Sequence, residues 1–245
     1  MIKILGHRGI NQPEYDLPYQ NTMEAFNYAI SKGSGGFELD VIVNKDGKCF
    51  VIHDDDISKH SNLSTGAISQ LTSEEIKQKT VGNKTHHQIP SLEVVLTNFK
   101  TSEIIINIEM KGQGIAENII NEIIATKYPL ENIIISSFNH QDLHAVRDLN
   151  KDIKLGILFG QEAKHNKFFE DYLMLLAEKI EPSVYCMEKT IPFLRILESS
   201  KEKYFWTIKK EDLANFMVQG LLMYENVNFI TDYPEELITF LQKTS

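Results

Sequence analysis

The sequence has little cysteine, no long apolar run and no excess of positive charge, and each shortage excludes a class of protein. Two cysteines, Cys49 and Cys186, in 245 residues are too few to hold a fold together by disulfides. No apolar run reaches the roughly 18 residues that a membrane helix needs. The 25 Lys and Arg residues are outnumbered by 34 Asp and Glu residues, and the net charge of -9 argues against nucleic-acid binding.

The composition is that of an ordinary globular chain. Hydrophobic residues make up 42% and charged residues 24%, which argues against disorder or a coiled coil. No linker rich in Pro, Gly or Ser divides the sequence, so we expect residues 1–245 to form one domain. The first seven residues lack the apolar region of a signal peptide and already have the pattern of a strand. We expect a cytoplasmic protein without a membrane span, either a monomer or a homodimer.

Short apolar runs alternate with longer helical patterns, which predicts parallel strands joined by crossover helices. The first helix is expected to start near Asn21, where Asn21 can cap it and Glu24 stands at the capping-box position. Further helices are expected over about 91–99, 114–127, 140–149, 166–180, 190–201, 210–219 and 234–242. The expected strands are 2–6, 36–42, 49–53, 103–110, 132–137, 153–159, 182–187, 203–208 and 227–231.

Nine strands are one too many for an eight-stranded barrel, and the extra one can be identified. No helix separates 36–42 from 49–53, and the connection contains Asp46-Gly47, a strong hairpin-turn signal. We therefore expect 49–53 to fold back antiparallel beside 36–42. The other eight strands predict a (β/α)8 TIM barrel. The alternative, an open doubly wound sheet that binds a dinucleotide, is weakened because no G-x-G-x-x-G follows the first strand.

Acidic side chains stand where two of the expected strands end. Glu38 and Asp40 point to one face of their strand, and Glu109 follows on the next barrel strand. Three carboxylates side by side need a compensating charge. An all-oxygen cluster suits one divalent cation, Mg²⁺ or Ca²⁺. The alternative is a network of salt bridges to Arg8 and Lys111 without a metal, and the addition of Glu109 favours the metal.

Two histidines are expected near the same cluster. His7 ends the first strand, and the predicted hairpin returns His53 to the level of Glu38 and Asp40. Such a pair can act as general acid and general base. Arg8 and Lys111 can neutralise the acids or hold an anionic substrate, and Arg can grip a phosphate with two hydrogen bonds. The six other histidines are expected at the surface: His60, His86, His87, His140, His144 and His165.

Seven short motifs within the first 111 residues occur in an order that resembles the glycerophosphodiester phosphodiesterase family. They are Gly6-His7-Arg8-Gly9, Pro18-Tyr19-Gln20-Asn21-Thr22, Glu38-Leu39-Asp40-Val41, Lys45-Asp46-Gly47, Val51-Ile52-His53-Asp54, Pro90-Ser91-Leu92-Glu93 and Asn107-Ile108-Glu109-Met110-Lys111. Weaker matches follow downstream: Thr65-Gly66, Ser137-Phe138, Trp206-Thr207 and Thr231-Asp232-Tyr233-Pro234. The resemblance implies a TIM barrel that hydrolyses deacylated phospholipids to glycerol 3-phosphate and an alcohol.

The resemblance also implies a role for each matching residue. His7 and His53 are implied as the acid–base pair, and Glu38, Asp40 and Glu109 as ligands of the metal. Arg8 and Lys111 are implied as phosphate contacts, and Phe138 and Trp206 as walls of the glycerol or alcohol pocket. For both aromatic residues, packing in the core is the alternative.

Three features depart from the family pattern. Gln20 stands where the family usually has Glu, which removes a negative charge near the site, and the loop from Gly9 to Pro18 looks longer than usual. We expect Gln20 and Asn21 to contact the residues that touch the metal or the substrate, without touching either themselves. Lys209 replaces an Asn after the Trp206 run, which bears on contacts to the alcohol.

Three functions are therefore compared. The first is metal-dependent hydrolysis of glycerophosphodiesters such as glycerophosphocholine or glycerophosphoethanolamine. The second is a related phosphodiesterase acting on lysophospholipids, for which the cluster Phe168, Phe169, Tyr172 and Leu173 would have to line an apolar groove instead of packing on the barrel. The third is a phosphoglycerol-binding barrel without activity, and retention of both histidines and all three acids argues against it.

Overall fold

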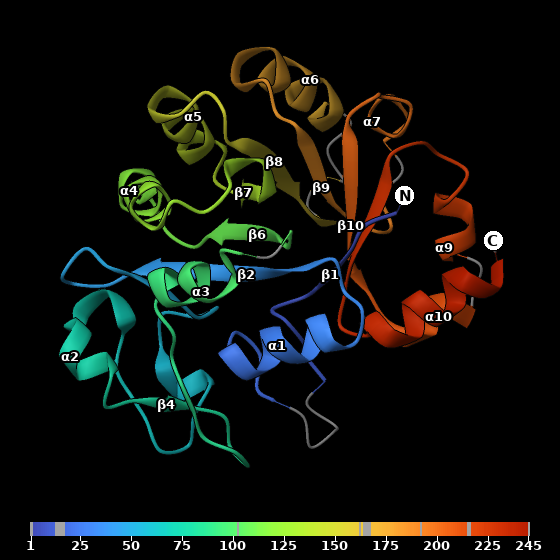
Figure 1. Ribbon diagram of the computed structural model, residues 1–245. Coiled ribbons are helices and arrows are strands. Elements are labelled where there is room, and N and C mark those ends of the chain that lie inside the picture. Colours follow the sequence, from blue (N-terminus) through green and yellow to red (C-terminus); the bar gives the residue numbers. More distant parts are fainter. Residues whose placement is uncertain are drawn as a thin grey trace.

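Eight parallel strands close into a barrel, as the alternation of apolar runs and helices predicts (Figure 1). The fold is described from a computed structural model, for residues 2–12, 18–101, 103–161, 163, 168–191, 193–214 and 217–244. The barrel strands are β1 (Ile4–Gly6), β2 (Gly36–Val43), β6 (Ile105–Met110), β7 (Ile133–Ser137), β8 (Lys154–Phe159), β9 (Val184–Glu188), β10 (Glu202–Ile208) and β11 (Val227–Thr231). β1 pairs with both β2 and β11, which closes the ring.

The extra strand predicted over 49–53 is the hairpin partner of β2. β3 (Cys49–Val51) runs antiparallel to β2, with Val41 opposite Val51 and Val43 opposite Cys49. Gly47 has φ +77°, which fits the turn that Asp46-Gly47 predicts. After β3 the backbone N–H of Ile52 donates to the Asp40 carbonyl at 3.0 Å. His53 is therefore placed at the level of Asp40, as predicted.

Helices surround the barrel, mostly where the apolar periodicity places them (Figure 1). They are α1 (Met23–Ser31), α3 (Leu92–Phe99), α4 (Ala116–Thr126), α5 (His140–Leu149), α6 (Phe169–Ile180), α7 (Leu194–Leu197), α8 (Lys210–Ala214), α9 (Met217–Leu221) and α10 (Pro234–Thr244). The predicted helix 190–201 is wrong in length, because only Leu194–Leu197 is helical among the described residues. The predicted helix 210–219 is described as two pieces, α8 and α9, and residues 215–216 between them lie outside the described part. None of the described helices has the length and apolar character needed to cross a bilayer.

A subdomain between β3 and α3 extends beyond the barrel, at the lower left of Figure 1. It contains α2 (Ser73–Ile76) and a short hairpin whose strands have two residues each, β4 (Thr80–Val81) and β5 (His87–Gln88). The hairpin was not predicted. Apolar side chains of the subdomain, among them Ile57 and Ile68, pack in one core with Phe50 of β3. It therefore covers the outer side of the β2–β3 hairpin that carries His53 toward the barrel.

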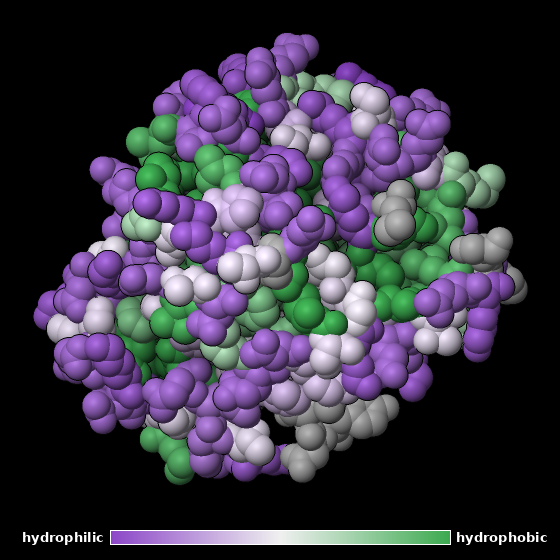
Figure 2. Space-filling model, in the orientation of Figure 1, coloured by the Kyte–Doolittle hydropathy of each residue, from purple (hydrophilic) through white to green (hydrophobic). Residues whose placement is uncertain are grey.

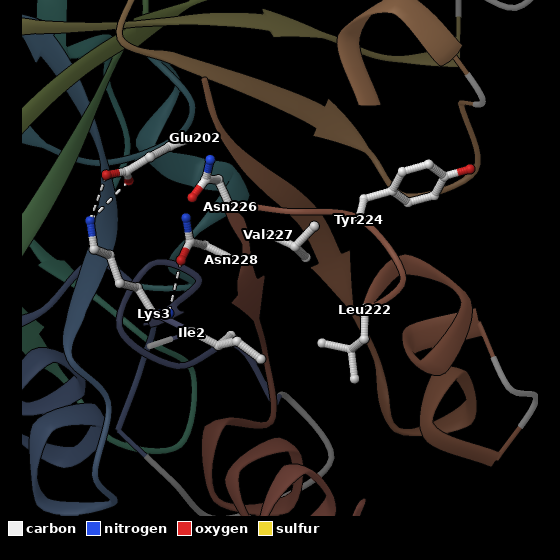
Figure 3. A pocket seen from close by; sticks show the side chains of 8 residues that line it. All are labelled: Ile2, Lys3, Glu202, Leu222, Tyr224, Asn226, Val227 and Asn228. Atoms are coloured by element: carbon white, nitrogen blue, oxygen red, sulfur yellow. Dashed lines mark hydrogen bonds and ion pairs between the residues drawn. The ribbon is translucent and has the colours of Figure 1, made fainter. Parts of the chain in front are cut away.

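The amino-terminal end of the barrel holds a cavity of about 400 Å³. Apolar side chains gather in a hollow beside α9 and α10 in the space-filling view (Figure 2). Some polar groups of this cavity contact one another: Lys3 Nζ lies 2.7 Å from Glu202, and the Lys3 backbone N–H donates to Asn228 Oδ1 at 2.9 Å (Figure 3). This end of a TIM barrel ordinarily serves stability, and catalytic groups collect at the opposite end.

Candidate active site

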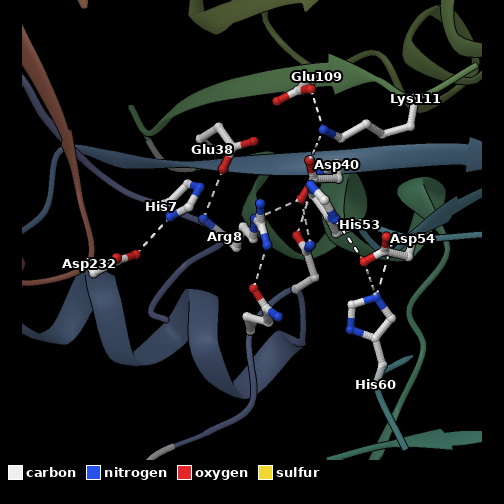
Figure 4. A network of polar contacts seen from close by, with 12 residues as sticks. His7, Arg8, Glu38, Asp40, His53, Asp54, His60, Glu109, Lys111 and Asp232 are labelled. Atoms are coloured by element: carbon white, nitrogen blue, oxygen red, sulfur yellow. Dashed lines mark hydrogen bonds and ion pairs between the residues drawn. The ribbon is translucent and has the colours of Figure 1, made fainter. Parts of the chain in front are cut away.

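A cavity of about 170 Å³ at the carboxyl ends of the strands brings together most of the residues singled out from the sequence. Its lining is His7, Arg8, Glu38, His53, Asn107, Glu109, Lys111, Ser136, Phe138, Leu158, Trp206, Thr207 and Ile230. Asp40 lies directly behind this lining with no exposed surface. Hydrogen bonds and ion pairs link Arg8, Glu38, Asp40, Glu109 and Lys111, and His7 and His53 lie beside this group, each paired with an aspartate (Figure 4).

The three acids meet because β2 and β6 are in register. Asp40 stands opposite Glu109, and Glu38 is two residues earlier on β2. All three are buried, and their ligand atoms lie within 4.8 Å of one another. This is the geometry that a shared cation requires, and the ligands are oxygens only.

Two cations face the three carboxylates. Arg8 Nε lies 3.2 Å from Asp40 Oδ2, and Lys111 Nζ lies 3.3 Å from Asp40 Oδ1 and also pairs with Glu109. Within the described part of the chain, the one hydrogen bond that Glu38 accepts comes from the backbone N–H of Arg8, at 2.9 Å, on Oε2. Its Oε1 is buried and has no hydrogen-bond partner among the described residues. The salt bridges expected under the metal-free alternative are thus present, but they do not neutralise the cluster.

The electrostatics of the cluster favour an additional positive charge. Burial, with the neighbouring Asp40 and Glu109 charges, raises the pKa of Glu38 well above its usual value. Burial and Asp40 raise the pKa of Glu109 to about 7. Burial alone would also raise the pKa of Asp40, but Arg8 and Lys111 hold it below its ordinary value. A divalent cation would stabilise the ionised forms of Glu38 and Glu109, so these residues fit a metal of the Mg²⁺ or Ca²⁺ type.

Each of the two predicted histidines is held by a carboxylate. His7 Nδ1 lies 2.7 Å from Asp232 Oδ1, and His53 Nδ1 lies 2.9 Å from Asp54 Oδ2. A carboxylate on Nδ1 fixes the ring and leaves Nε2 for other partners. Burial lowers the pKa of His53, which favours its neutral form. Both rings line the cavity and can exchange protons with a molecule inside it.

Asp232 and His60 were not predicted as site residues. His60 is only 4% exposed, so the surface prediction is wrong for it. Its Nε2 lies 3.2 Å from the Asp54 backbone nitrogen, and its Nδ1 lies 3.1 Å from the Tyr19 hydroxyl. His60 Nε2 also lies 3.2 Å from Asp54 Oδ2, so His60 supports the carboxylate that holds His53. His86, His87, His140 and His144 keep partial or full exposure, and His165 lies outside the described residues.

Gln20 and Asn21 hydrogen-bond to Arg8 and Asp40 and are not part of the cavity lining themselves. Gln20 Oε1 accepts from Arg8 Nη1 at 2.9 Å, and Asn21 Nδ2 donates to Asp40 Oδ2 at 2.8 Å. Asn21 is not the helix cap, because Thr22 Oγ1 accepts from the Ala25 N–H instead. Asn21 has φ +58°, an uncommon conformation that turns its side chain toward Asp40. The Gly9–Pro18 loop includes residues 13–17, which lie outside the described part of the chain.

Phe138 and Trp206 form the apolar side of the cavity. Their ring centroids are 5.7 Å apart with the planes nearly perpendicular, a favourable edge-to-face contact. Phe138 is 44% exposed and so marks the mouth of the cavity. The indole N–H of Trp206 is buried without an acceptor among the described residues.

Comparisons with known proteins agree with this arrangement. Residues 7–236 match the sequence profile of the glycerophosphoryl diester phosphodiesterase family. A glycerophosphodiester phosphodiesterase of Caldanaerobacter subterraneus subsp. tengcongensis is 31% identical over an alignment that covers 98% of each chain. The match extends across the barrel and the site residues together.

Solved structures give the same fold. A glycerophosphodiester phosphodiesterase from Thermotoga maritima superposes with a TM-score of 0.75 at 26% identity and covers 98% of each chain. A phosphodiesterase from Oleispira antarctica, solved with the product sn-glycerol-3-phosphate, has a TM-score of 0.79 at 20% identity. That alignment covers 98% of this chain and 96% of the other.

Proposed function

Because this chain belongs to the glycerophosphoryl diester phosphodiesterase family, we propose that it hydrolyses deacylated phospholipids to sn-glycerol 3-phosphate and an alcohol. The chain is a phosphoric diester hydrolase, and the proposal concerns its substrates and the roles of its residues. Glycerophosphocholine and glycerophosphoethanolamine are the substrates proposed. The product complex of the Oleispira antarctica phosphodiesterase supports glycerol 3-phosphate as the product here.

The observation that carries the proposal is the arrangement of two carboxylate-held histidines beside the acidic cluster. His7 and His53 line the same cavity as Glu38 and Glu109. Diester hydrolysis needs one proton removed from the nucleophile and another given to the leaving alcohol. Two histidines whose Nε2 atoms have no hydrogen-bond partner among the described residues can supply both transfers.

Glu38, Asp40 and Glu109 would hold one divalent cation, Mg²⁺ or Ca²⁺. When bound in such a site, a divalent cation withdraws charge from a phosphoryl oxygen. The protein supplies the remaining charge: Arg8 and Lys111 line the cavity and can contact the other phosphoryl oxygens. Gln20 and Asn21 keep Arg8 and Asp40 in position through the hydrogen bonds described above.

The lysophospholipid alternative receives less support from the packing of α6. Leu173 is fully buried, and Phe169 stacks on Phe193 at a centroid distance of 6.3 Å. Half of the predicted apolar cluster is thus occupied in packing on the barrel. Phe168 and Tyr172 are exposed, but two side chains do not make a groove for an acyl chain.

The test is to identify the products from three substrates by ³¹P NMR, with Mg²⁺ or Ca²⁺ present. Glycerophosphocholine and glycerophosphoethanolamine should each give glycerol 3-phosphate, and lysophosphatidylcholine should be hydrolysed more slowly. Faster hydrolysis of lysophosphatidylcholine to lysophosphatidic acid would favour the second function. Binding of glycerol 3-phosphate without turnover of any substrate would favour the third.

A further inference from the structure

Asn107 and Ser136 form a neutral polar pair on the wall of the cavity, and the proposed catalytic machinery does not use them. Asn107 is 1% exposed and Ser136 has no exposed surface, yet both line the cavity. Ser136 Oγ donates to Asn107 Oδ1 at 2.8 Å. Asn107 stands directly opposite Glu38 in the β2–β6 register. The pair therefore lies beside the acidic cluster at the buried end of the cavity.

The hydrogen bond between the two side chains fixes what each can offer to a ligand. Because Asn107 Oδ1 is engaged by Ser136, its amide Nδ2 is turned the other way and carries two N–H donors. No described residue accepts a hydrogen bond from this Nδ2. Ser136 Oγ has given its only proton to Asn107 and keeps lone pairs that can accept. The pair thus presents a free donor and a free acceptor next to each other.

A donor beside an acceptor matches an alcohol hydroxyl better than a phosphoryl oxygen. A hydroxyl both accepts and donates, whereas an ionised phosphoryl oxygen only accepts. The phosphate can be bound by the positively charged residues of the same cavity, Arg8 and Lys111. Leu158 and Ile230, 4% and 2% exposed, complete the buried end with apolar surface suited to C–H groups. This end of the cavity has the chemistry of a small polyol site.

We propose that Asn107 and Ser136 bind a free hydroxyl of the glycerol group and so select glycerol-containing phosphodiesters. The glycerol then occupies the buried end of the cavity, and the departing alcohol lies toward the mouth at Phe138, which is 44% exposed. Asn107 is a substrate-binding residue in this account, and Ser136 also positions the Asn107 amide. The inference rests on the proposed function, because it concerns the substrate of the same site.

Binding measurements separate recognition of glycerol from recognition of phosphate. Calorimetric titrations with sn-glycerol 3-phosphate and with inorganic phosphate are compared for the wild-type protein and Asn107→Ala, each with saturating Mg²⁺. Asn107→Ala should weaken glycerol 3-phosphate binding roughly 10- to 100-fold, the range for removing one partner of a buried hydrogen bond. Its affinity for inorganic phosphate should stay within about twofold of wild type, because Arg8, Lys111 and the acids are unchanged.

Kinetics with a substrate that lacks glycerol give a second readout. Asn107→Ala should lower kcat/KM for glycerophosphocholine by a similar factor and lower kcat/KM for bis(p-nitrophenyl) phosphate much less. Ser136→Ala keeps the Asn107 donor but no longer fixes its orientation. The preference for glycerophosphocholine over bis(p-nitrophenyl) phosphate should therefore fall by a smaller factor than in Asn107→Ala. Ser137→Ala is the matched control. Ser137 is an equally buried serine on the same strand whose Oγ accepts from the Asn139 N–H outside the cavity lining.

Each outcome decides between defined possibilities. Unchanged glycerol 3-phosphate binding in Asn107→Ala would overturn the inference, and so would an equal loss for both ligands. If Asn107→Ala does not fold, the comparison rests on Ser136→Ala and Ser137→Ala, and equal behaviour of those two would overturn the inference. A wild-type protein that neither binds glycerol 3-phosphate nor hydrolyses glycerophosphocholine would instead overturn the proposed function.

Discussion

His7 and Asp232 form a 2.7 Å contact between His7 Nδ1 and Asp232 Oδ1, although 225 positions separate them in the sequence. The contact exists because β1 pairs with β11 and closes the barrel. Asp232 follows the last residue of β11, and His7 follows the last residue of β1. The carboxylate therefore holds the imidazole from the side away from the cavity and sets which nitrogen carries the proton.

Asp232→Asn should lower kcat for glycerophosphocholine by at least about 100-fold while keeping the fold. The amide has nearly the same shape, but its NH₂ group can place the His7 proton on the wrong nitrogen, as in other His–carboxylate pairs. The checks are steady-state kinetics and thermal unfolding of both proteins. A variant with more than half of the wild-type kcat would show that Asp232 does not orient a reacting histidine.

His7→Ala and His53→Ala should each reduce turnover below about a tenth of the wild-type rate, a loss of more than ~1.4 kcal/mol in the activation barrier. Both rings line the cavity, so their loss removes a proton-transfer group without opening the core. His86→Ala is the matched control, because His86 is exposed on the outer hairpin. A fully active His7 or His53 variant would exclude that residue from proton transfer.

The sequence was sufficient for the barrel, because buried parallel strands are short apolar runs and the extra strand carries its own turn signal at Asp46-Gly47. It also placed His7, Glu38, Asp40 and Glu109 at the carboxyl ends of barrel strands, where the structure brings them together. It missed the β4–β5 hairpin, because two-residue strands carry no periodic pattern. It also missed the roles of His60 and Asp232, whose partners are set by tertiary contacts. The predicted cap, Asn21, is wrong because Asn and Thr are both favoured at helix N-caps and the two residues are adjacent. Only the fold brings Asp40 beside Asn21.

Glu38→Gln should stabilise the metal-free protein at pH 8 and abolish stabilisation by Mg²⁺ or Ca²⁺. The substitution removes one of three buried, mutually repelling carboxylates, and Glu38 Oε1 has no hydrogen bond to lose among the described residues. Thermal unfolding with and without each cation measures both effects. If the variant is still stabilised by cations to the wild-type extent, Glu38 is not a ligand.

Stabilisation by a fixed concentration of Mg²⁺ should be larger at pH 8 than at pH 6. In the metal-free protein burial and Asp40 raise the pKa of Glu109 to about 7, so this carboxylate is mostly protonated at pH 6, and burial raises the pKa of Glu38 as well. A cation must displace the Glu109 proton, and its affinity therefore rises as the pH increases through about 7. The shift in Tm between metal-free and Mg²⁺-containing samples checks this. Equal shifts at both pH values would contradict the assignment of these acids as ligands.

The most direct test of the account measures glycerol 3-phosphate release from glycerophosphocholine by metal-stripped protein, before and after Mg²⁺ or Ca²⁺ is restored. Wild-type protein should be inactive when stripped and regain activity with at least one of the two cations, whereas Glu109→Gln should stay inactive in both states. Release by the stripped wild-type protein at the full rate, or full activity of Glu109→Gln, would contradict metal-dependent hydrolysis at the Glu38, Asp40 and Glu109 cluster.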